Sequence, residues 1–489
     1  MQKTLARNAA FNIVYRVLNV VFPLITTAHV SRVLTPEGIG NVAYAQNIVS
    51  YFVMFAVLGI PRYGTREIAK NRNDLATRNK LFTEIVIINT ISTAVCALLY
   101  YIVVLLGVFQ DALIYFVCGI ELLFNFINID WLYEGEEEYA YIAKRSVLIK
   151  FLAIVALFIF VKDKKDYPIY AFVTCLGLGC NHILNVFHAR KYVKLTFRNL
   201  EIGKHCRPVL VLALSALASS LYGNVNITML GWLSNTESVG YYNNAHKVVN
   251  MVLTLVTAVS SVFMPRLSYL YPNDIARYRK LITIGAKIVL FLAIPCAVGI
   301  ALVAEDAIIV LFGELFLPAK WTLRIMSVLT IIIGVGDLLC YQAIISSGKE
   351  RLLIRSRIYA GIANMVLSMI FVPLYQHAGA AIALVVSEII VNGMLLKQAS
   401  QITKLCVDRG YVFKLIIGVT AMTVVVCGVQ FVVRSSMLSL VVAVGMGALT
   451  YLVIEKMLNN DFLLLIRQLK NLDGVSCDIY TDETKTING

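Results

Sequence analysis

Charged side chains are scarce in this sequence of 489 residues. Only 15% of the residues are Asp, Glu, Lys or Arg, whereas a soluble domain is about one quarter charged. Hydrophobic residues make up 59%, and the mean hydropathy is +0.77. A single soluble core stops growing at roughly 250–300 residues, so one soluble domain does not fit this chain. The composition is typical of an integral membrane protein.

Motifs for catalysis and metal binding are also missing. The ten cysteines form no CxxC pair and no Cys/His spacing of a metal site. No nucleophile elbow, ATP-binding glycine loop, dinucleotide fingerprint or zincin motif occurs in the sequence. We therefore expect no catalytic residues, no metal, no cofactor and no enzymatic activity.

Apolar runs of about 20 residues recur along the chain, which is the length that crosses roughly 30 Å of hydrocarbon. Strands of alternating polarity are absent, so the spans are predicted to be helices. The predicted fold is an all-α polytopic membrane protein. About fourteen candidate spans lie near residues 10–33, 38–60, 81–108, 112–133, 146–161, 168–188, 208–232, 241–264, 281–304, 320–345, 358–376, 379–400, 414–433 and 437–455.

The formal net charge of +14 has a simple explanation in the loops. When both termini are placed in the cytoplasm, most of the 43 Lys and Arg residues lie in the cytoplasmic loops and termini. This is the positive-inside pattern of a membrane protein. It accounts for the basic balance without a nucleic-acid partner. The basic loop 162–166, on the opposite side, is the exception.

An internal repeat appears at an offset of 200 residues. Residues 34–40 (LTPEGIG) and 234–240 (SNTESVG) each precede or begin an apolar run, and Pro-Arg follows both runs, at Pro61 and Pro265. An even number of predicted spans separates the copies, so the two halves share one orientation. The repeat predicts two parallel six-helix lobes, 1–205 and 206–402, followed by two additional helices and a short cytoplasmic tail in 403–489. Transporters of this construction bind substrate between lobes and alternate its access.

Polar residues recur at helical spacing on the first helix of each predicted lobe and on the helices that follow. Such stripes are also typical of helix packing through hydrogen bonds. Arg16 and Lys247 favour a water-filled cavity, because a charge deep in a bilayer is unfavourable. Pro23 interrupts the first helix and is a candidate hinge. The candidate substrate-binding residues are Asn12, Arg16, Asn19, Asn47, Ser219, Asn226, Asn243, Lys247 and Asn250.

Four acidic residues within the predicted spans are candidates for ion coupling: Glu84, Asp130, Asp337 and Glu388. They could pair with the basic residues or carry a proton or Na⁺. Asp130 lies beside Trp131 near a helix end, where an interfacial structural role is an equal alternative. The acidic stretch 134–138 that follows is expected to be a solvated turn.

Several motifs resemble the polysaccharide flippases of the O-antigen repeat-unit type. This family belongs to the superfamily of multidrug, oligosaccharidyl-lipid and polysaccharide exporters. The motifs are residues 31–40 (SRVLTPEGIG), 59–67 (GIPRYGTRE) and 130–135 (DWLYEG). The family more often has an aromatic-Gln-Gly where this chain has Tyr133-Glu134-Gly135.

The resemblance implies translocation of an undecaprenyl-pyrophosphate-linked oligosaccharide across the bacterial cytoplasmic membrane, from the inner to the outer leaflet. Membrane lipids, a polysaccharide polymerase and glycosyltransferases are the implied partners. Three alternatives stay open. A cation-coupled multidrug exporter would favour acidic residues in the cavity, and no residue excludes a lipid II flippase. A membrane-embedded glycan polymerase or acyltransferase would need a catalytic constellation and usually a large outer loop, which is not predicted.

Overall fold

The computed structural model describes residues 22–23, 25–109, 111–349, 351–400 and 408–460. All regular secondary structure in these residues is helical, which confirms the predicted fold class. Eight described helices are long and apolar enough to span a membrane, or nine if one bent pair is a single span. The chain is thus a multi-pass membrane protein, and the larger number of about fourteen spans stays a prediction.

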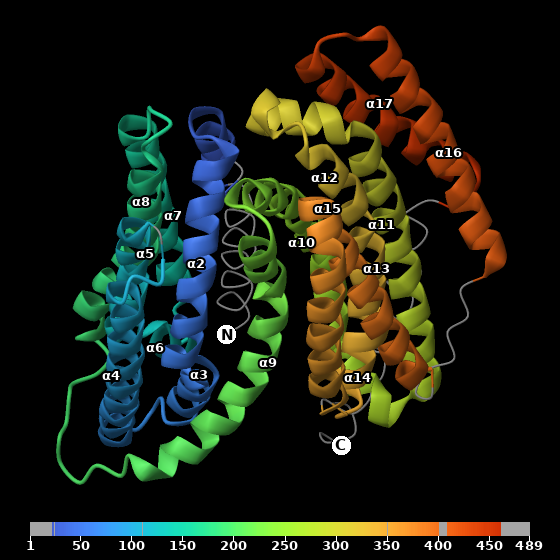
Figure 1. Cartoon of the computed structure of the whole chain (residues 1–489). Helices are drawn as coiled ribbons and strands as arrows, with labels where there is room; N and C mark the ends of the chain where they lie inside the picture. Colours follow the sequence, from blue (N-terminus) through green and yellow to red (C-terminus); the bar gives the residue numbers. More distant parts are fainter. Residues whose placement is uncertain (1–21, 24, 110, 350, 401–407, 461–489) are drawn as a thin grey trace, which may run out of the picture. The chain divides into compact units, whose positions relative to one another are not determined.

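The chain divides into two compact units, 1–243 and 244–489. In unit 1 the described helices (Figure 1) are α2 (Pro36–Val57), α3 (Ile60–Lys70), α4 (Leu75–Leu105), α5 (Ala112–Phe124), η1 (Asn125–Ile127), α6 (Asp130–Gly135), α7 (Tyr139–Phe160), α8 (Tyr167–Ala189) and α9 (Gly203–Leu233). Helix α10 (Thr236–Asn273) begins in unit 1 and continues in unit 2. The lobe boundaries at 205/206 and 402/403, which come from the repeat, stay predictions.

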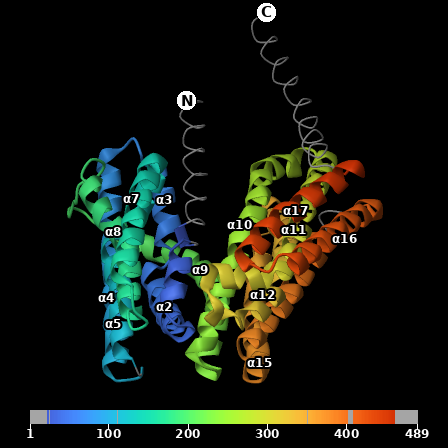
Figure 2. The same cartoon turned by 90° about the horizontal axis from the view of Figure 1, so that it is seen from above.

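Unit 2 continues with α11 (Ile275–Phe312), η2 (Glu314–Phe316), α12 (Ala319–Ser327), α13 (Leu329–Gly336), the π-helix η3 (Asp337–Gln342), α14 (Ala343–Ser346), α15 (Arg351–Ala399), α16 (Arg409–Val432) and α17 (Ser436–Met457). Within α15 the backbone leaves helical geometry at Gln376 (φ 49°). A Cβ on Gly379 would lie 2.0 Å from the carbonyl oxygen of Phe371, so the chain turns sharply there. This turn separates the predicted spans 358–376 and 379–400. Helices α16 and α17 pack together and against α11 (Figure 2).

The start of α2 shows how the sequence sets a helix boundary. The Thr35 side chain accepts a hydrogen bond from the amide of Gly38 (3.2 Å), and Pro36 occupies the first turn. Both features favour a helix start. The helix ends at Val57, the next residue, Leu58, has a φ of 51°, and Pro61 stands in the first turn of the next helix, α3.

The two copies of the sequence repeat contact each other reciprocally in unit 1. A Cβ on Gly40 would lie 1.6 Å from the carbonyl oxygen of Thr236, and a Cβ on Gly240 would lie 2.1 Å from that of Pro36. Because 36 and 40 correspond to 236 and 240, each copy offers the same glycine and the same carbonyl to the other. Equivalent surfaces that meet in this way are typical of a two-fold contact. Glycine is required at both positions, since the backbones touch.

We expect Gly40→Ala to destabilise this contact. The added methyl group overlaps the Thr236 carbonyl, so the starts of α2 and α10 must separate, and overpacking of this kind costs about 1–3 kcal/mol. Thermal unfolding of the purified protein in detergent measures the effect. Gly38→Ala is the matched control, because its Cβ would meet Tyr167 at an ordinary 3.4 Å. Equal unfolding temperatures for both variants would contradict the close approach.

Candidate functional site

Two of the sequence motifs pack against each other at one end of unit 1. A Cβ on Gly64 of α3 would lie 2.6 Å from the ring of Trp131, and a Cβ on Gly135 of α6 would lie 2.7 Å from the Ile68 side chain. Both glycines therefore allow α3 and α6 to touch. The buried apolar cluster around them consists of Ile60, Tyr63, Ile68, Phe82, Ile85, Ile88, Ile129, Trp131, Leu132, Tyr133, Ala189, Val193 and Val209.

The acidic stretch after α6 is held by hydrogen bonds and ion pairs. Arg78 pairs with Glu136 at 2.9 Å, and the Glu136 side chain is only 7% exposed. Arg72 pairs with Glu137 at 3.3 Å, and this side chain is 59% exposed. Tyr192 donates to Glu138 at 2.6 Å, and burial together with this bond raises the pKa of Tyr192. The expected solvated turn is therefore correct for Glu137 and wrong for Glu136.

Glu84, a predicted ion-coupling residue, lies in a buried cluster beside these motifs. Its carboxylate is 2.7 Å from Nε2 of His205, whose Nδ1 lies 2.6 Å from the Tyr63 hydroxyl. Both the Glu84 and His205 side chains are buried. The same carboxylate accepts the backbone amide of Glu201 at 2.5 Å. Glu84 thus joins α4 to the start of α9, and its ion-coupling role stays a prediction.

Asp130 lines a polar cavity of about 300 Å³ in unit 1. Arg145 of α7 approaches Asp130 at 3.1 Å, and both side chains also bond to the buried amide of Asn185. The Arg145 side chain is 5% exposed and that of Asp130 is 40% exposed. The lining comprises Val53, Glu121, Phe124, Asn125, Asn128, Asp130, Arg145, Ser146, Lys150, Gly177, Leu178, Gly179, Asn181 and His182.

Arg145 and Asn185 are site residues that the sequence analysis missed. The predicted span began at residue 146, which placed Arg145 in a loop. Helix α7 begins at Tyr139 instead, so Arg145 lies more than one turn inside it. The available signal was a basic residue just before an apolar run, with an acidic residue about four turns earlier in the chain, at the start of the preceding helix α6. The pair fits the structural alternative for Asp130, because a buried guanidinium needs a counter-ion.

Polar residues connect α2 to α9 within unit 1. Asn47 donates to the Thr228 hydroxyl at 2.7 Å, and Tyr51 bonds to the same hydroxyl at 2.7 Å. Asn226, on the same helix as Thr228, is buried. These contacts match the helix-packing interpretation of the polar stripe. A substrate-binding role for Asn47 and Asn226 stays a prediction.

The other candidates are distributed over both units. Asn243 is half-buried in unit 1; Lys247 is half-buried and Asn250 exposed in unit 2, where Asn250 lies 3.3 Å from His246. Glu388 accepts from Asn392 at 2.9 Å on the same helix. Asp337 begins η3, and π-helical turns are frequent at functional sites.

Four of the candidate residues have side chains outside the described part of the structure. Asn12, Arg16 and Asn19 lie outside the described residues, and so does the side chain of Ser219. Pro23 is exposed within a helical segment, and Thr26 donates to its carbonyl at 3.1 Å. Its role as a hinge stays a prediction.

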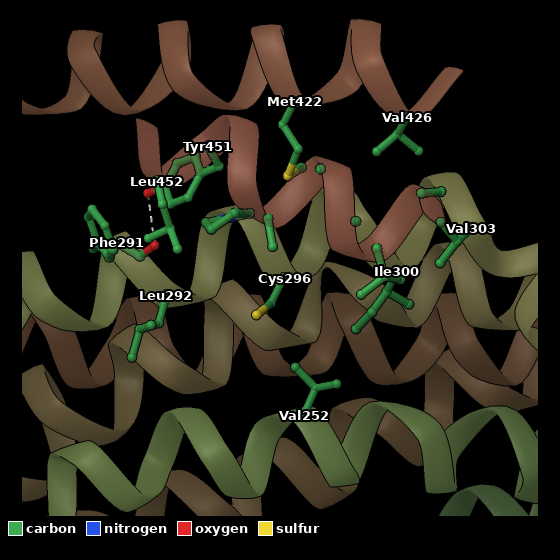
Figure 3. A pocket seen from close by; sticks show the side chains of 16 residues that line it. Val252, Phe291, Leu292, Cys296, Ile300, Val303, Met422, Val426, Tyr451 and Leu452 are labelled. Atoms are coloured by element: carbon green, nitrogen blue, oxygen red, sulfur yellow. Dashed lines mark hydrogen bonds between the residues drawn. The ribbon is translucent and has the colours of Figure 1, made fainter. Parts of the chain in front are cut away.

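Unit 2 contains an apolar groove of about 380 Å³ between α10, α11, α16 and α17 (Figure 3). Its lining is almost entirely carbon and sulfur, and the Tyr451 hydroxyl is occupied by a 2.9 Å bond to the Phe291 carbonyl. The lining residues are Val252, Phe291, Leu292, Pro295, Cys296, Gly299, Ile300, Val303, Met422, Val426, Ala443, Val444, Gly447, Ala448, Tyr451 and Leu452. Such a surface suits a hydrocarbon chain.

The motifs, the polar cavity and the helical architecture can be compared with known proteins. The family model described as "Polysaccharide biosynthesis protein" matches residues 5–271. This chain belongs to that family. A protein named "Putative O-antigen transporter" from Escherichia coli (strain K12) is 26% identical over 401 residues, covering 80% of this chain and 96% of that protein. The match confirms the resemblance drawn from the motifs.

One further relative and one solved structure are also similar to this chain. Capsular polysaccharide biosynthesis protein CapF of Staphylococcus aureus is 22% identical over 398 residues, covering 79% of this chain and 97% of its own. The solved structure of the lipid II flippase MurJ in an inward closed conformation has a TM-score of 0.75 at 15% identity. The match covers 92% of this chain and 98% of the MurJ chain. At this identity the likeness establishes the transporter fold alone.

We expect Arg145→Gln to lower the stability of unit 1. The change leaves the Asp130 carboxylate without its charged donor, and losing a hydrogen bond to a charged group costs about 1.5–3 kcal/mol. Thermal unfolding in detergent measures the loss. Lys144→Gln is the control, since Lys144 is the exposed neighbour on the same helix. If both variants lose the same amount of thermal stability, the loss comes from the change in net charge and not from the contact between Arg145 and Asp130.

Proposed function

We propose that this protein flips an undecaprenyl-pyrophosphate-linked oligosaccharide repeat unit from the inner to the outer leaflet of the bacterial cytoplasmic membrane. The observation that carries this proposal is the match to an O-antigen transporter over 96% of that protein's length. The loop charges support cytoplasmic termini. The protein acts by alternating access and catalyses no bond making or breaking.

The head group of this substrate is anionic and rich in hydroxyl groups. We assign the pyrophosphate to Arg16 and Lys247, because guanidinium and ammonium groups are the preferred phosphate ligands in proteins. Amide side chains suit sugar hydroxyls, since each amide both donates and accepts hydrogen bonds. The amides assigned to this role are Asn12, Asn19, Asn47, Asn226, Asn243 and Asn250, together with the hydroxyl of Ser219.

The prenyl tail requires a hydrocarbon surface while the head group crosses. The groove between α11, α16 and α17 is a suitable surface, because its lining is apolar throughout. Exposed apolar residues on α16 and α17, such as Val424 and Leu449, place these helices in contact with lipid. We infer that the tail stays in or along this groove and does not enter a polar cavity.

A carrier that moves a charged head group in one direction needs an energy source. We propose a proton or Na⁺ gradient, with Glu388, Asp337, Asp130 or Glu84 as the coupling carboxylate and Pro23 as a hinge in the first helix. The repeat unit would be supplied by glycosyltransferases and consumed by a polysaccharide polymerase, which are the implied partners.

Loss of flipping in the double variant Arg16→Ala/Lys247→Ala tests the head-group assignment. The purified protein in liposomes, given a labelled undecaprenyl-pyrophosphate sugar, should make the label accessible from the other leaflet. The double variant should be at least about tenfold slower, equivalent to ~1.4 kcal/mol of lost interaction. The assay is run with and without an imposed pH or Na⁺ gradient.

The controls separate the outcomes. Arg16→Lys/Lys247→Arg keeps both charges and should retain most of the activity. Normal flipping in the alanine variant would refute the cationic head-group site. Export of an amphipathic cationic dye without any lipid flipping would refute the flippase function and favour the multidrug branch.

Filling the apolar groove should slow the flipping of long prenyl chains. Gly299→Phe projects a ring into the groove without a clash, because a Cβ on Gly299 has open space around it. We expect at least about a fivefold slower rate for the undecaprenyl substrate, or ~1 kcal/mol, and a smaller effect for a short prenyl analogue. The rates are measured in the same liposome assay.

Gly428→Phe is the matched control for this groove variant. Gly428 lies on α16, also has open space around a Cβ, and does not line the groove. It should leave both rates unchanged. Equal slowing of both prenyl lengths by Gly299→Phe would contradict a tail site in the groove.

A further inference from the structure

Residues 190–202 connect α8 to α9 (Figure 1), and their first part, 190–198, is a strap that starts with a turn at 190–192. Its backbone is tied to the first turns of α4. The Lys194 amide donates to Asn79 at 2.9 Å, and the Thr196 amide donates to the Thr83 hydroxyl at 2.9 Å. Asn79 and Thr83 are four residues apart and therefore share one face of α4. The strap consequently runs along α4 in a fixed register.

The amides of Lys194 and Thr196, which bond to α4, are two residues apart, as they would be in an extended chain, where alternate side chains point to opposite sides. Val193, Leu195 and Phe197 form one side of the strap. Val193 is buried in the apolar cluster of unit 1, but Leu195 is 58% exposed and Phe197 is 72% exposed. Val193 therefore packs in the protein core, whereas the large apolar side chains of Leu195 and Phe197 are not covered by protein.

Basic residues accompany these apolar side chains. Arg190, Lys191, Lys194 and Arg198 are all exposed, and no acidic residue occurs between 190 and 200. The strap follows directly on α8, a membrane-span candidate, and lies against the start of α4, another one. The positive-inside pattern assigns this end of both helices to the cytoplasm.

We propose that the strap 190–198 is a docking edge for anionic phospholipids of the cytoplasmic leaflet. Leu195 and Phe197 enter the boundary between head groups and acyl chains, and the four basic side chains meet the lipid phosphates. Apolar side chains flanked by Lys and Arg, at the level of a membrane surface, have this combination of affinities. A soluble protein partner would not explain why the apolar side chains sit at the ends of two spans.

Docking at the strap bears directly on the motif cluster of unit 1. Arg78 donates to the Tyr192 carbonyl at 2.7 Å while it pairs with Glu136, and the Tyr192 hydroxyl donates to Glu138. The strap is therefore part of the same network as α4 and the acidic stretch that follows α6. A lipid that binds only the folded strap stabilises this network by mass action.

The first test measures where Phe197 lies. Phe197→Trp is placed in nanodiscs of phosphatidylglycerol and phosphatidylcholine, and its fluorescence is compared with that of the wild type, which has three tryptophans. Lipids brominated near the head group should quench the added signal. The control is Lys164→Trp, in the exposed basic loop 162–165 that follows the C-terminal end of α7. Its added signal should be quenched much less. If aqueous iodide quenches the added signal of Phe197→Trp and brominated lipid does not, the proposal is overturned and a protein partner is favoured.

The second test measures the preference for anionic lipid. In detergent, added phosphatidylglycerol should raise the unfolding temperature of the wild type by about 3 °C or more over phosphatidylcholine. Lys194→Gln/Arg198→Gln should lose at least half of that difference. Lys164→Gln/Lys165→Gln removes the same charge elsewhere and should keep it. Equal losses in both double variants would overturn the proposal, because they would reflect net charge alone.

Neither test uses the transported substrate, so the result does not depend on the proposed flippase function. If phosphatidylglycerol does not stabilise the wild type but the protein still flips its substrate, the docking edge is refuted and the proposed function stands. If the strap binds anionic lipid but the protein does not flip the substrate, the proposed function is refuted and the docking edge stands.

Discussion

The structure depends on one constraint: in a bilayer, no polar backbone or charged group is stable without a partner. Helices satisfy the backbone, so the described residues contain no strand. Side chains follow the same constraint. Glu84 is buried beside His205, and Arg145 is buried beside Asp130 and Asn185. The first cluster joins α4 to α9, and the second joins the consecutive helices α6, α7 and α8. The pairing of polar side chains therefore also specifies which helices pack together.

Close backbone contact is the second requirement, since apolar helices in lipid gain little from burying more apolar surface. Glycine allows close helix contact at two places in unit 1. Gly64 and Gly135 bring α3 and α6 together, and Gly40 and Gly240 bring the two repeat copies together. The first pair lies inside the family motifs. These motifs are thus explained by packing as much as by transport chemistry.

The sequence predicted the elements that depend on local pattern. Apolar runs predicted membrane helices, and the span predicted from residue 38 corresponds to α2, which begins two residues earlier at Pro36. The 200-residue repeat anticipated that residues 36–40 and 236–240 would be equivalent, although not that they would touch. The site was less predictable. Arg145 was assigned to a loop because hydropathy measures lipid compatibility, whereas α7 begins with polar turns at Tyr139. Partners that are distant in sequence, such as Asn185 and Arg145, leave no periodic signal.

Polar and apolar surfaces occupy different parts of the fold, and this separation bears on how an amphipathic lipid could cross. The polar cavity around Asp130 lies in unit 1, and the apolar groove of α11, α16 and α17 lies in unit 2. A single enclosed site would have to dehydrate the sugars or hydrate the tail, and both are unfavourable. The proposed function avoids both penalties, because it assigns the tail to the apolar groove and the head group to other, polar residues. Helices α16 and α17 line this groove, and none of its lining residues is charged.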